Sequence, residues 1–153
     1  MKALVQRVSS AKVEVDMATI GQIECGLLVF LGVEENDLIE DLDYLVKKIS
    51  GLRIFSDNAG KMNLSIEQVG GSLLIVSQFT LVADTRKGNR PSFNNAANPN
   101  KGFEYYLKAI EKFKQTGIPV KSGKFGASMN VSLVNDGPVT IWIDSKERTR
   151  SRN

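Results

Sequence analysis

The 153-residue sequence contains no histidine and a single cysteine, Cys25. The absence of histidine excludes Ser-His-Asp triads, HExxH zinc sites and every acid–base mechanism that relies on an imidazole. One cysteine cannot form an intramolecular disulfide, which favours a reduced, intracellular protein. With one cysteine and no histidine, a zinc site built only from side chains is not expected, so we predict no metal centre.

Long apolar runs are also absent. The longest run, residues 27–31, is far too short to span a bilayer. The start of the chain, MKALVQRVSSAKVEV, alternates in polarity and lacks the apolar core of a signal peptide. We therefore expect a cytoplasmic protein that does not contact a membrane.

The residues that are present are typical of a globular chain, with 42% hydrophobic and 24% charged residues. A chain of this length buries roughly 68–70% of its unfolded surface, so a single domain spanning residues 1–153 is expected to be stable without disulfides or metals. The net charge of +3 and the pI near 9.0 are compatible with a polyanionic partner.

Hydrophobic periodicity predicts strands separated by two helices. Residues 3–15 alternate and read as a strand that turns at residues 16–19 into a hairpin with residues 20–24. Continuous apolar runs at residues 27–33 and 73–79 indicate buried strands. Apolar residues at helical spacing mark two amphipathic helices, one with Leu38, Leu42, Leu45, Val46 and Ile49, the other with Phe103, Tyr106, Leu107, Ile110 and Phe113.

The ends of these elements carry local signals. Asp37 followed by Glu40 resembles a capping box at the start of the first helix, and Gly51 suits its end. Gly117 suits the end of the second helix. Residues 53–55 look like a short strand.

Two further alternating segments, residues 129–133 and 139–143, predict half-buried strands that lie as antiparallel neighbours. The fold class is therefore α+β, a mostly antiparallel, barrel-like sheet with two main helices. The similarity of GLLVFLG to GSLLIVSQ also suggests an internal duplication.

A basic loop occupies residues 84–101, where Arg86, Lys87, Arg90 and Lys101 accompany only one acid, Asp84. Loops of this length are uncommon in compact domains and are often functional. Two interpretations stay open, a solvated surface loop and a loop that contacts nucleic-acid phosphates. The tail after about residue 145 is also basic, and residues 146–152 are expected to fray.

Two polar segments interrupt the apolar pattern. Ser77, Gln78 and Thr80 end a hydrophobic run, and they either bond their own backbone or form the floor of a ligand pocket. Residues 135–138, Asn-Asp-Gly-Pro, have the composition of a tight turn. Pro138 lacks a backbone donor and must sit at a strand edge or at a first position.

These segments also carry a resemblance. SQFTL at residues 77–81 and NDGPVT at residues 135–140, with MKALVQRV at the start, closely resemble the D-aminoacyl-tRNA deacylase family. LRIFSDNAGKMN and KFGASMNVSL are also similar to family sequence, so the resemblance runs from Met1 to about Ile143. It implies a homodimer that hydrolyses the ester between a D-amino acid and the 3′ end of tRNA, without metal or organic cofactor.

The resemblance also implies roles for individual residues. Ser77, Gln78, Phe79 and Thr80 would form the catalytic pocket wall and the site for the 3′ end. Gly137 and Pro138, joined by a cis bond, would reach into the pocket of the partner subunit and select the substrate.

Four further positions follow from the same resemblance. Phe125 would meet the terminal adenosine and Met129 would line the same pocket. Arg7 and Gly126 would brace the Gly-Pro turn.

A protein without histidine needs a catalytic group from elsewhere, and the substrate carries a ribose hydroxyl beside the ester. Backbone N–H groups of Phe79 and Thr80 are candidate oxyanion donors. Thr80 as a direct nucleophile ranks second, because no activating base is evident. If Gly137 and Pro138 select by excluding L-residues, glycyl-tRNA should be cleaved too.

Two functions of other classes stay open. One is a non-catalytic RNA-binding module, suggested by the basic loop, and the other is a small-molecule regulatory domain.

Overall fold

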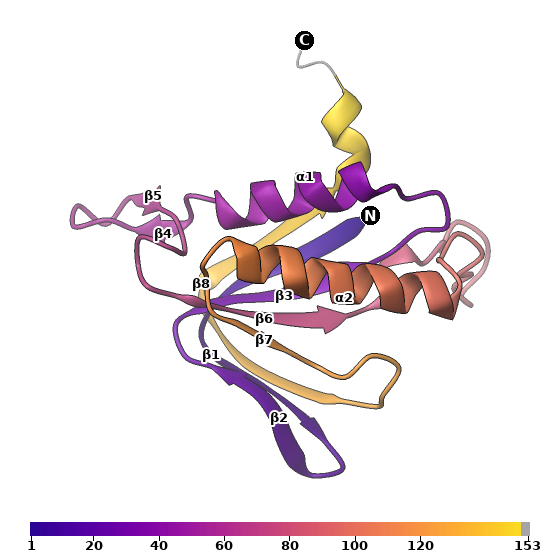
Figure 1. The fold of residues 1–153 in the computed structure, drawn as a ribbon, viewed down its shortest axis with the longest axis horizontal. Coiled ribbons are helices and arrows are strands. Elements are labelled where there is room, and N and C mark those ends of the chain that lie inside the picture. The colour runs from indigo at the N-terminus through magenta and orange to yellow at the C-terminus, as the bar shows by residue number, and fades with distance from the viewer. Residues whose placement is uncertain (151–153) are drawn as a thin grey trace.

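The computed structural model describes residues 1–150 and consists of one main sheet, a small two-stranded sheet and two long helices (Figure 1). The elements in chain order are β1 (Lys2–Val15), β2 (Ala18–Ile23), β3 (Gly26–Gly32), α1 (Ile39–Ser50), β4 (Phe55–Ser56), β5 (Met62–Leu64), β6 (Ser72–Ser77), the 3₁₀ helix η1 (Phe79–Val82), α2 (Pro99–Gln115), β7 (Val120–Ser122), β8 (Asn130–Asp144) and the 3₁₀ helix η2 (Ser145–Thr149). No helix within residues 1–150 is both long and apolar enough to cross a membrane.

The main sheet is organised around β1. Its strand order is β2-β1-β3-β6-β7, and β8 pairs with the other edge of β1. All three pairings of β1 are antiparallel, whereas β3–β6 and β6–β7 are parallel. The strong curvature of the long strands β1 and β8 gives the sheet the expected barrel-like form with two helices (Figure 1), so the α+β fold class is confirmed.

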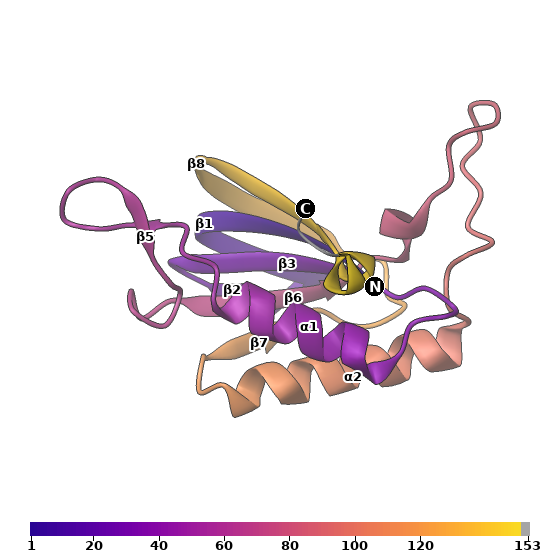
Figure 2. The ribbon, with the colours of Figure 1, turned by 90° about the horizontal axis from the view of Figure 1, so that it is seen from above.

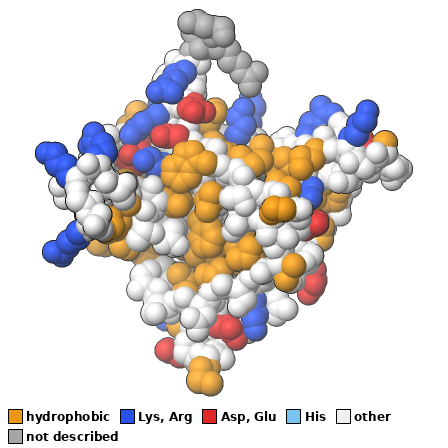
Figure 3. All heavy atoms as spheres, turned by 180° about the vertical axis from the view of Figure 1, so that it is seen from behind, with side chains coloured by type: hydrophobic (Ala, Val, Ile, Leu, Met, Phe, Trp, Pro, Cys, Tyr) orange, Lys and Arg blue, Asp and Glu red, His pale blue; other side chains and the backbone are white. Residues whose placement is uncertain are grey.

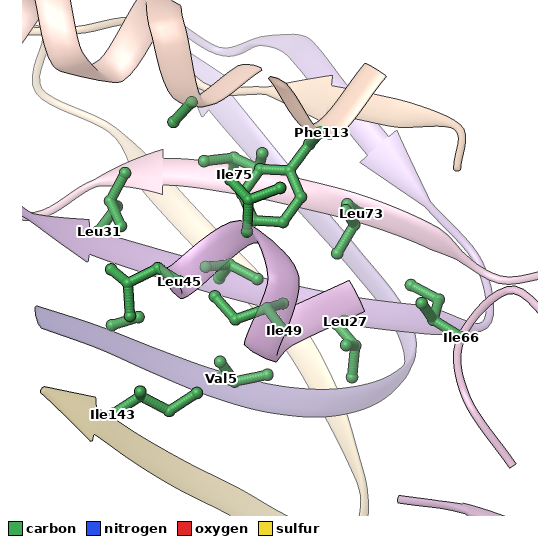
Figure 4. Packing of buried hydrophobic residues seen from close by; sticks show 14 of the residues in the cluster. Val5, Leu27, Leu31, Leu45, Ile49, Ile66, Leu73, Ile75, Phe113 and Ile143 are labelled. Carbon is green, nitrogen blue, oxygen red and sulfur yellow. The ribbon is translucent and has the colours of Figure 1, made fainter. Parts of the chain in front are cut away.

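The core lies between the sheet and the helices. Viewed from above, α1 and α2 lie next to each other on one face of the sheet (Figure 2). Side chains from β1, β3, β6, α1 and α2 meet in this layer, among them Val5, Leu27, Leu45, Ile75 and Phe113 (Figure 4). The apolar runs at residues 27–33 and 73–79 become β3 and β6, which are central and therefore covered on both faces.

The two similar segments, GLLVFLG and GSLLIVSQ, lie next to each other as parallel neighbours. Gly26 pairs with Ser72 and Leu27 with Leu73, so the two segments run side by side along their length. This placement is compatible with an internal duplication, which stays a prediction.

The last two predicted strands are one strand, β8, and the expectation of two antiparallel neighbours is wrong. Both halves of β8 pair with β1, from Lys2–Asp144 to Glu14–Asn130. The register is irregular on both sides of Val8: Arg7 faces residues 136–139 of β8, and Ser9 has no partner between the Val8–Asn135 and Ser10–Val134 pairs. Residues 135–138 therefore form an irregularity within a strand instead of a tight turn. Pro138, which has no backbone N–H, lies in this irregularity, where β8 has no register partner in β1.

Helix boundaries differ from the prediction at α1. The helix is capped at Leu38, whose N–H donates to Asp41 Oδ2 at 2.8 Å. Asp37 has a tertiary role instead: its carboxylate accepts the N–H of Glu34 at 2.6 Å and the ammonium of Met1. Gly51 does end the helix.

The buried face of α2 also differs from the prediction. It is formed by Gly102, Tyr106, Ala109 and Phe113. Phe103 and Leu107 were expected on this face but are 46% and 49% exposed. A glycine takes the inward position at residue 102 because the helix approaches Phe125 closely there.

Strand ends shift by small amounts. The first hairpin forms as expected, but its turn is only Asp16 and Met17, which both have positive φ. β6 ends at Ser77, so Phe79 belongs to η1. The short strand expected at residues 53–55 is β4, Phe55–Ser56.

Two segments expected to lack structure are ordered. η2 is attached by Lys146 Nζ–Glu34 Oε1 and Arg148 Nε–Asp41 Oδ1, both at 2.9 Å, so the prediction that residues 146–152 fray is wrong for residues 146–149. Arg152 lies outside the described residues. The loop of residues 84–101 contains a bridge between Asp84 and Ser92, and its last residue, Lys101, is already in α2.

Candidate active site

A cavity of about 520 Å³ opens at the carboxyl ends of the parallel strands β3 and β6, beside the start of α2. This is the size of a small-molecule site, and the carboxyl ends of parallel strands are a common place for ligands. The lining residues are Leu31, Val33, Val76, Ser77, Gln78, Phe79, Ala97, Asn98, Pro99, Gly102, Phe125, Gly126, Ala127, Met129 and Val131.

One wall of the cavity is the point where β6 stops. The N–H of Gln78 donates to the carbonyl of Leu31 at 2.8 Å, after which the chain turns into η1. Ser77, Gln78 and Phe79 line the cavity, as the pocket interpretation of this segment predicts. The backbone N–H groups at the start of η1 have no acceptor inside that helix, so they are available to a ligand.

Thr80 lies next to this wall but is not part of the lining. Its hydroxyl is exposed and accepts a hydrogen bond from Gln78 Nε2 at 2.5 Å. A side-chain amide cannot take up a proton from a hydroxyl. The geometry therefore provides Thr80 with an orienting partner and not with a base.

The opposite wall is aromatic. The ring centroid of Phe125 lies 5.2 Å from Phe103 and 5.9 Å from Tyr106. The hydroxyl of Tyr106 donates to the carbonyl of Ile75 at 2.9 Å, and burial raises its pKa to about 12, which keeps it a donor at neutral pH. A Cβ on Gly102 would come within 3.3 Å of the Phe125 ring, so the glycine gives this ring its space.

The cavity is uncharged. None of its lining residues, all of them in the described part of the chain, has an acidic or basic side chain. Any proton transfer in this cavity must use backbone groups, hydroxyls or the ligand itself. Residues 1–150 also contain no cluster of three or more His, Cys, Asp or Glu side chains that could hold a metal ion.

The Gly-Pro segment forms a second group. The Gly137–Pro138 bond is cis, and Gly137 has a φ of +147°, a conformation that favours glycine. Arg7 is buried beside this segment and donates from Nε to the carbonyl of Asp136 at 2.8 Å and from Nη1 to that of Ile54 at 2.6 Å. The side chain of Asn135 accepts the N–H of Val139 at 2.7 Å, so the irregular segment is held from both sides.

The two groups lie apart within one chain. Arg7 pairs with Leu27 at the start of β3, whereas the cavity is lined by Leu31 at the end of that strand. Four residues of strand correspond to about 13 Å. Of the predicted residues, the structure brings together Ser77, Gln78, Phe79, Phe125, Gly126 and Met129 at the cavity, and separately Arg7, Gly137 and Pro138. Gly126 therefore lies with the cavity and not with the Gly-Pro segment of its own chain.

Some lining residues were not predicted from the sequence. Leu31 lies at the end of β3 and Val33 directly follows that strand, and the start of α2 contributes Asn98 and Pro99. The sequence does indicate a helix start at Asn98 and Pro99, because Asn is a common N-cap and Pro is common at the first helical position. The side chain of Asn98 indeed accepts the N–H of Lys101 at 3.0 Å.

A second cavity, of about 530 Å³, lies between the segment before α1 and η2 and is polar. Asp37, one of its lining residues, binds the buried ammonium of Met1, which also donates to Ser145 Oγ at 2.7 Å. Burial raises the pKa of Asp37 even though the ammonium bonds its carboxylate. These groups are satisfied by one another, which indicates a structural role.

Comparison with known proteins gives consistent matches. Residues 4–144 match the model of the D-Tyr-tRNA(Tyr) deacylase family. The chain is 54% identical over 147 residues to a D-aminoacyl-tRNA deacylase of Thermotoga petrophila, which covers 96% of this chain and 99% of the relative. It is 55% identical over 147 residues to the D-aminoacyl-tRNA deacylase of Clostridioides difficile, with the same coverage of 96% and 99%.

Solved structures give the same picture. The c-Myc DNA Unwinding Element Binding Protein superposes with a TM-score of 0.90 at 41% identity, covering 94% of this chain and 98% of that one. A probable eukaryotic D-amino acid tRNA deacylase superposes with a TM-score of 0.78 over 93% of this chain and 97% of that one. Its identity of 17% shows a shared fold alone.

Proposed function

The chain belongs to the D-Tyr-tRNA(Tyr) deacylase family, and on this basis we propose that it hydrolyses the ester that joins a D-amino acid to the 3′ end of tRNA. The products are free amino acid and tRNA. The observation that carries the proposal is the position of residues 77–79, which line a ligand-sized cavity at the carboxyl ends of two parallel strands. We place this activity in the cytoplasm, since the chain has one cysteine and acts on tRNA.

The chemistry fits an uncharged cavity. Water attacks the ester carbonyl, the resulting oxyanion collapses, and the ribose oxygen leaves with a proton. The neighbouring ribose hydroxyl assists the proton transfer, because the cavity lining has no acidic or basic side chain. Backbone N–H groups of Phe79 and Thr80 stabilise the oxyanion, and loss of one such donor in other enzymes costs about 10²–10³ in rate.

We further propose that the site is completed by a second copy of the chain, whose Gly137 and Pro138 reach into the cavity. Support comes from the distance of about 13 Å along the strands that separates the two groups in one chain. The sheet face away from the helices is also apolar (Figure 3). Across three adjacent strands on that face, Leu4 pairs with Phe30 and with Trp142, which is 49% exposed.

Selection of the D-form then follows from exclusion. Backbone carbonyls of Gly137 and Pro138 placed against the α-carbon leave no room for the group that an L-residue puts there. A favourable contact with a D side chain in an apolar pocket would contribute only ~1–3 kcal/mol, too little for strong discrimination. A site that works by exclusion accepts hydrogen on both sides of the α-carbon, so glycine on a non-cognate tRNA is a second substrate.

The test is deacylation of D-alanyl, glycyl and L-alanyl esters of one tRNA at equal enzyme concentration. We expect rapid loss of the D-alanyl and glycyl esters and survival of the L-alanyl ester. Glycine that resists like L-alanine would show that the D side chain is recognised and would refute exclusion. Equal survival of all three esters would refute the deacylase function.

The alternative is a non-catalytic RNA-binding module, favoured by the basic residues 84–92. Such a module would bind tRNA without releasing amino acid. The same assay, combined with a measurement of tRNA binding, separates the two functions.

A further inference from the structure

A hairpin of residues 84–92 projects from the rim of the cavity. Backbone groups of Asp84 and Ser92 close it by exchanging hydrogen bonds of 2.8 and 2.9 Å. Seen from above, the segment between η1 and α2 extends well beyond the rest of the molecule (Figure 2). The hairpin therefore offers a surface that the body of the protein does not cover.

Both ends of this hairpin are attached to the wall of the cavity. On the incoming side, Phe79 lines the cavity and packs edge-to-face on Phe93 with centroids 5.1 Å apart. On the outgoing side, the N–H of Ala97 donates to the carbonyl of Val33 at 3.0 Å, and both residues line the cavity. A long molecule with one end in the cavity consequently passes close to the hairpin where it leaves.

The structure distinguishes engaged cations from available ones. Arg86 is held by Asp84, with Nη2–Oδ2 at 2.5 Å and Nε–Oδ1 at 2.9 Å. Lys101 donates to the carbonyl of Glu35. Lys87 and Arg90 are exposed and form no ion pair with any acid in the described part of the chain. Lys and Arg side chains are visible on the projecting loop at the left of Figure 3.

The cavity itself cannot attract phosphates, because its lining has no cationic side chain. A tRNA bound by its 3′ end must gain electrostatic affinity outside the cavity. Duplex nucleic acid carries about one negative charge per 1.7 Å of axis, and Lys and Arg contacts to it position the ligand without reading its sequence. Two flexible cations on a rim-anchored hairpin match this requirement.

Resting on the proposed function, we infer that Lys87 and Arg90 bind backbone phosphates of the acceptor arm of the tRNA whose 3′ end occupies the cavity. Asp84 and Arg86, which pair with each other, lie at the base of the hairpin that presents the two cations. The hairpin thus contributes to recognition of the polynucleotide, whereas the cavity handles the ester.

The test compares two substrates and two double variants. D-alanyl-tRNA contains the acceptor arm, and D-alanyl-adenosine contains only the terminal nucleoside. Lys87→Ala/Arg90→Ala removes the hairpin charges, and Lys47→Ala/Lys61→Ala removes the same charge at the opposite end of the molecule, where α1 ends and β4 meets β5 (Figure 1). Each variant is assayed between 50 and 200 mM salt, and its melting temperature is measured.

We expect Lys87→Ala/Arg90→Ala to lower kcat/KM for D-alanyl-tRNA roughly 10-fold at low salt. The slope of log kcat/KM against log salt concentration should flatten by about 2, one for each lost phosphate contact. Hydrolysis of D-alanyl-adenosine and the melting temperature should stay at wild-type values.

Three results would overturn the inference. The first is that Lys87→Ala/Arg90→Ala cleaves D-alanyl-tRNA as fast as the wild-type enzyme. The second is that this variant loses activity equally on D-alanyl-tRNA and D-alanyl-adenosine. The third is that Lys47→Ala/Lys61→Ala loses as much activity on D-alanyl-tRNA as the hairpin variant. In each case the wild-type enzyme still releases D-alanine, so the proposed function stands. A wild-type enzyme that cleaves neither ester refutes the proposed function itself.

Discussion

At the scale of single residues, the site depends on groups that do not ionise. Thr80 has an amide as its neighbour, and Tyr106 keeps its proton because burial raises its pKa to about 12. The absence of histidine from the sequence thus agrees with the uncharged lining of the cavity. Catalysis by position and backbone donors is what such a residue set can support.

Thr80→Ala is expected to retain substantial activity, because no base can convert the hydroxyl into a nucleophile. By contrast, replacing the ribose hydroxyl next to the ester by hydrogen should abolish turnover. Single-turnover rates with the variant and with the deoxy substrate measure both effects. If Thr80→Ala is inactive while the wild-type enzyme still cleaves the deoxy substrate, the hydroxyl of Thr80, and not that of the ribose, takes part in the reaction.

Asp84 should titrate far below an ordinary aspartate. Hydrogen bonds from the side chain and backbone of Arg86 hold the pKa of this carboxyl at about 2. Since the folded-state pKa is depressed, the Asp84–Arg86 contact is complete above the unfolded pKa near 3.9 and is lost as pH falls through about 2. An NMR titration of the carboxyl carbon tests this, and a midpoint near 3.9 would show that the contact does not form in solution.

At the scale of elements, local sequence patterns predicted most strands, but the prediction failed where contacts between residues far apart in the sequence determine the structure. The apolar run of residues 27–33 identified β3 because a strand covered on both faces is apolar throughout. Residues 135–138 look like a turn, but Arg7, far away in sequence, binds the carbonyl of Asp136 and keeps β8 in one piece. No local pattern reports that contact.

The same limit applies to α2 and to the cavity. Periodicity placed Phe103 and Leu107 on the buried face, yet the approach of Phe125 requires Gly102 there. The cavity combines residues from the ends of β3 and β6 with the start of α2 and the segment before β8. Spacing within one segment cannot show that these four parts meet; the resemblance of short motifs to a family pointed to several of their residues.

Gly102→Ala should separate stability from activity. Alanine in a helix is favoured over glycine by about 1 kcal/mol, so the melting temperature should stay equal or rise. The added methyl group lies 3.3 Å from the Phe125 ring and within the cavity lining, so the ring must shift by a few tenths of an ångström. We expect kcat/KM for D-aminoacyl-tRNA to fall roughly 10-fold.

Asn100→Ala, at an exposed position in the first turn of the same helix, is the matched control and should leave kcat/KM unchanged. Wild-type kinetics in Gly102→Ala would mean that the position of Phe125 is not critical.

At the scale of the whole molecule, the cavity and the Gly-Pro segment lie apart in one chain, separated by about 13 Å along the strands. The exposed Val134 and Trp142, at 57% and 49%, lie in the strand that carries the Gly-Pro segment. A contiguous apolar patch on a sheet face is typical of a protein–protein interface, and we predict that a second copy of the chain covers this one. A dimer that buries this face would bring the two groups together.

Complementation between subunits tests this arrangement. Phe125→Ala impairs the cavity, and Pro138→Ala impairs the Gly-Pro segment, so each homodimer has two defective sites. A mixed dimer has one site free of both substitutions, and activity should return when the two variants are refolded together. A mixture that is no more active than its components, or a fully active monomer in analytical ultracentrifugation, would refute the shared site.

The pairing of β1 with β8 has a consequence for synthesis. β1 pairs with three other strands, and along one of its edges, from Lys2 to Glu14, its partner is Asn130–Asp144, with an irregularity around Val8. On the ribosome β1 emerges before β8 and cannot find this partner until residues 130–144 have been translated. Until then its backbone edge is open, and closing so long a loop is slow. An open strand edge can pair with other chains, so we expect the sheet of a nascent chain to close only after β8 has left the exit tunnel.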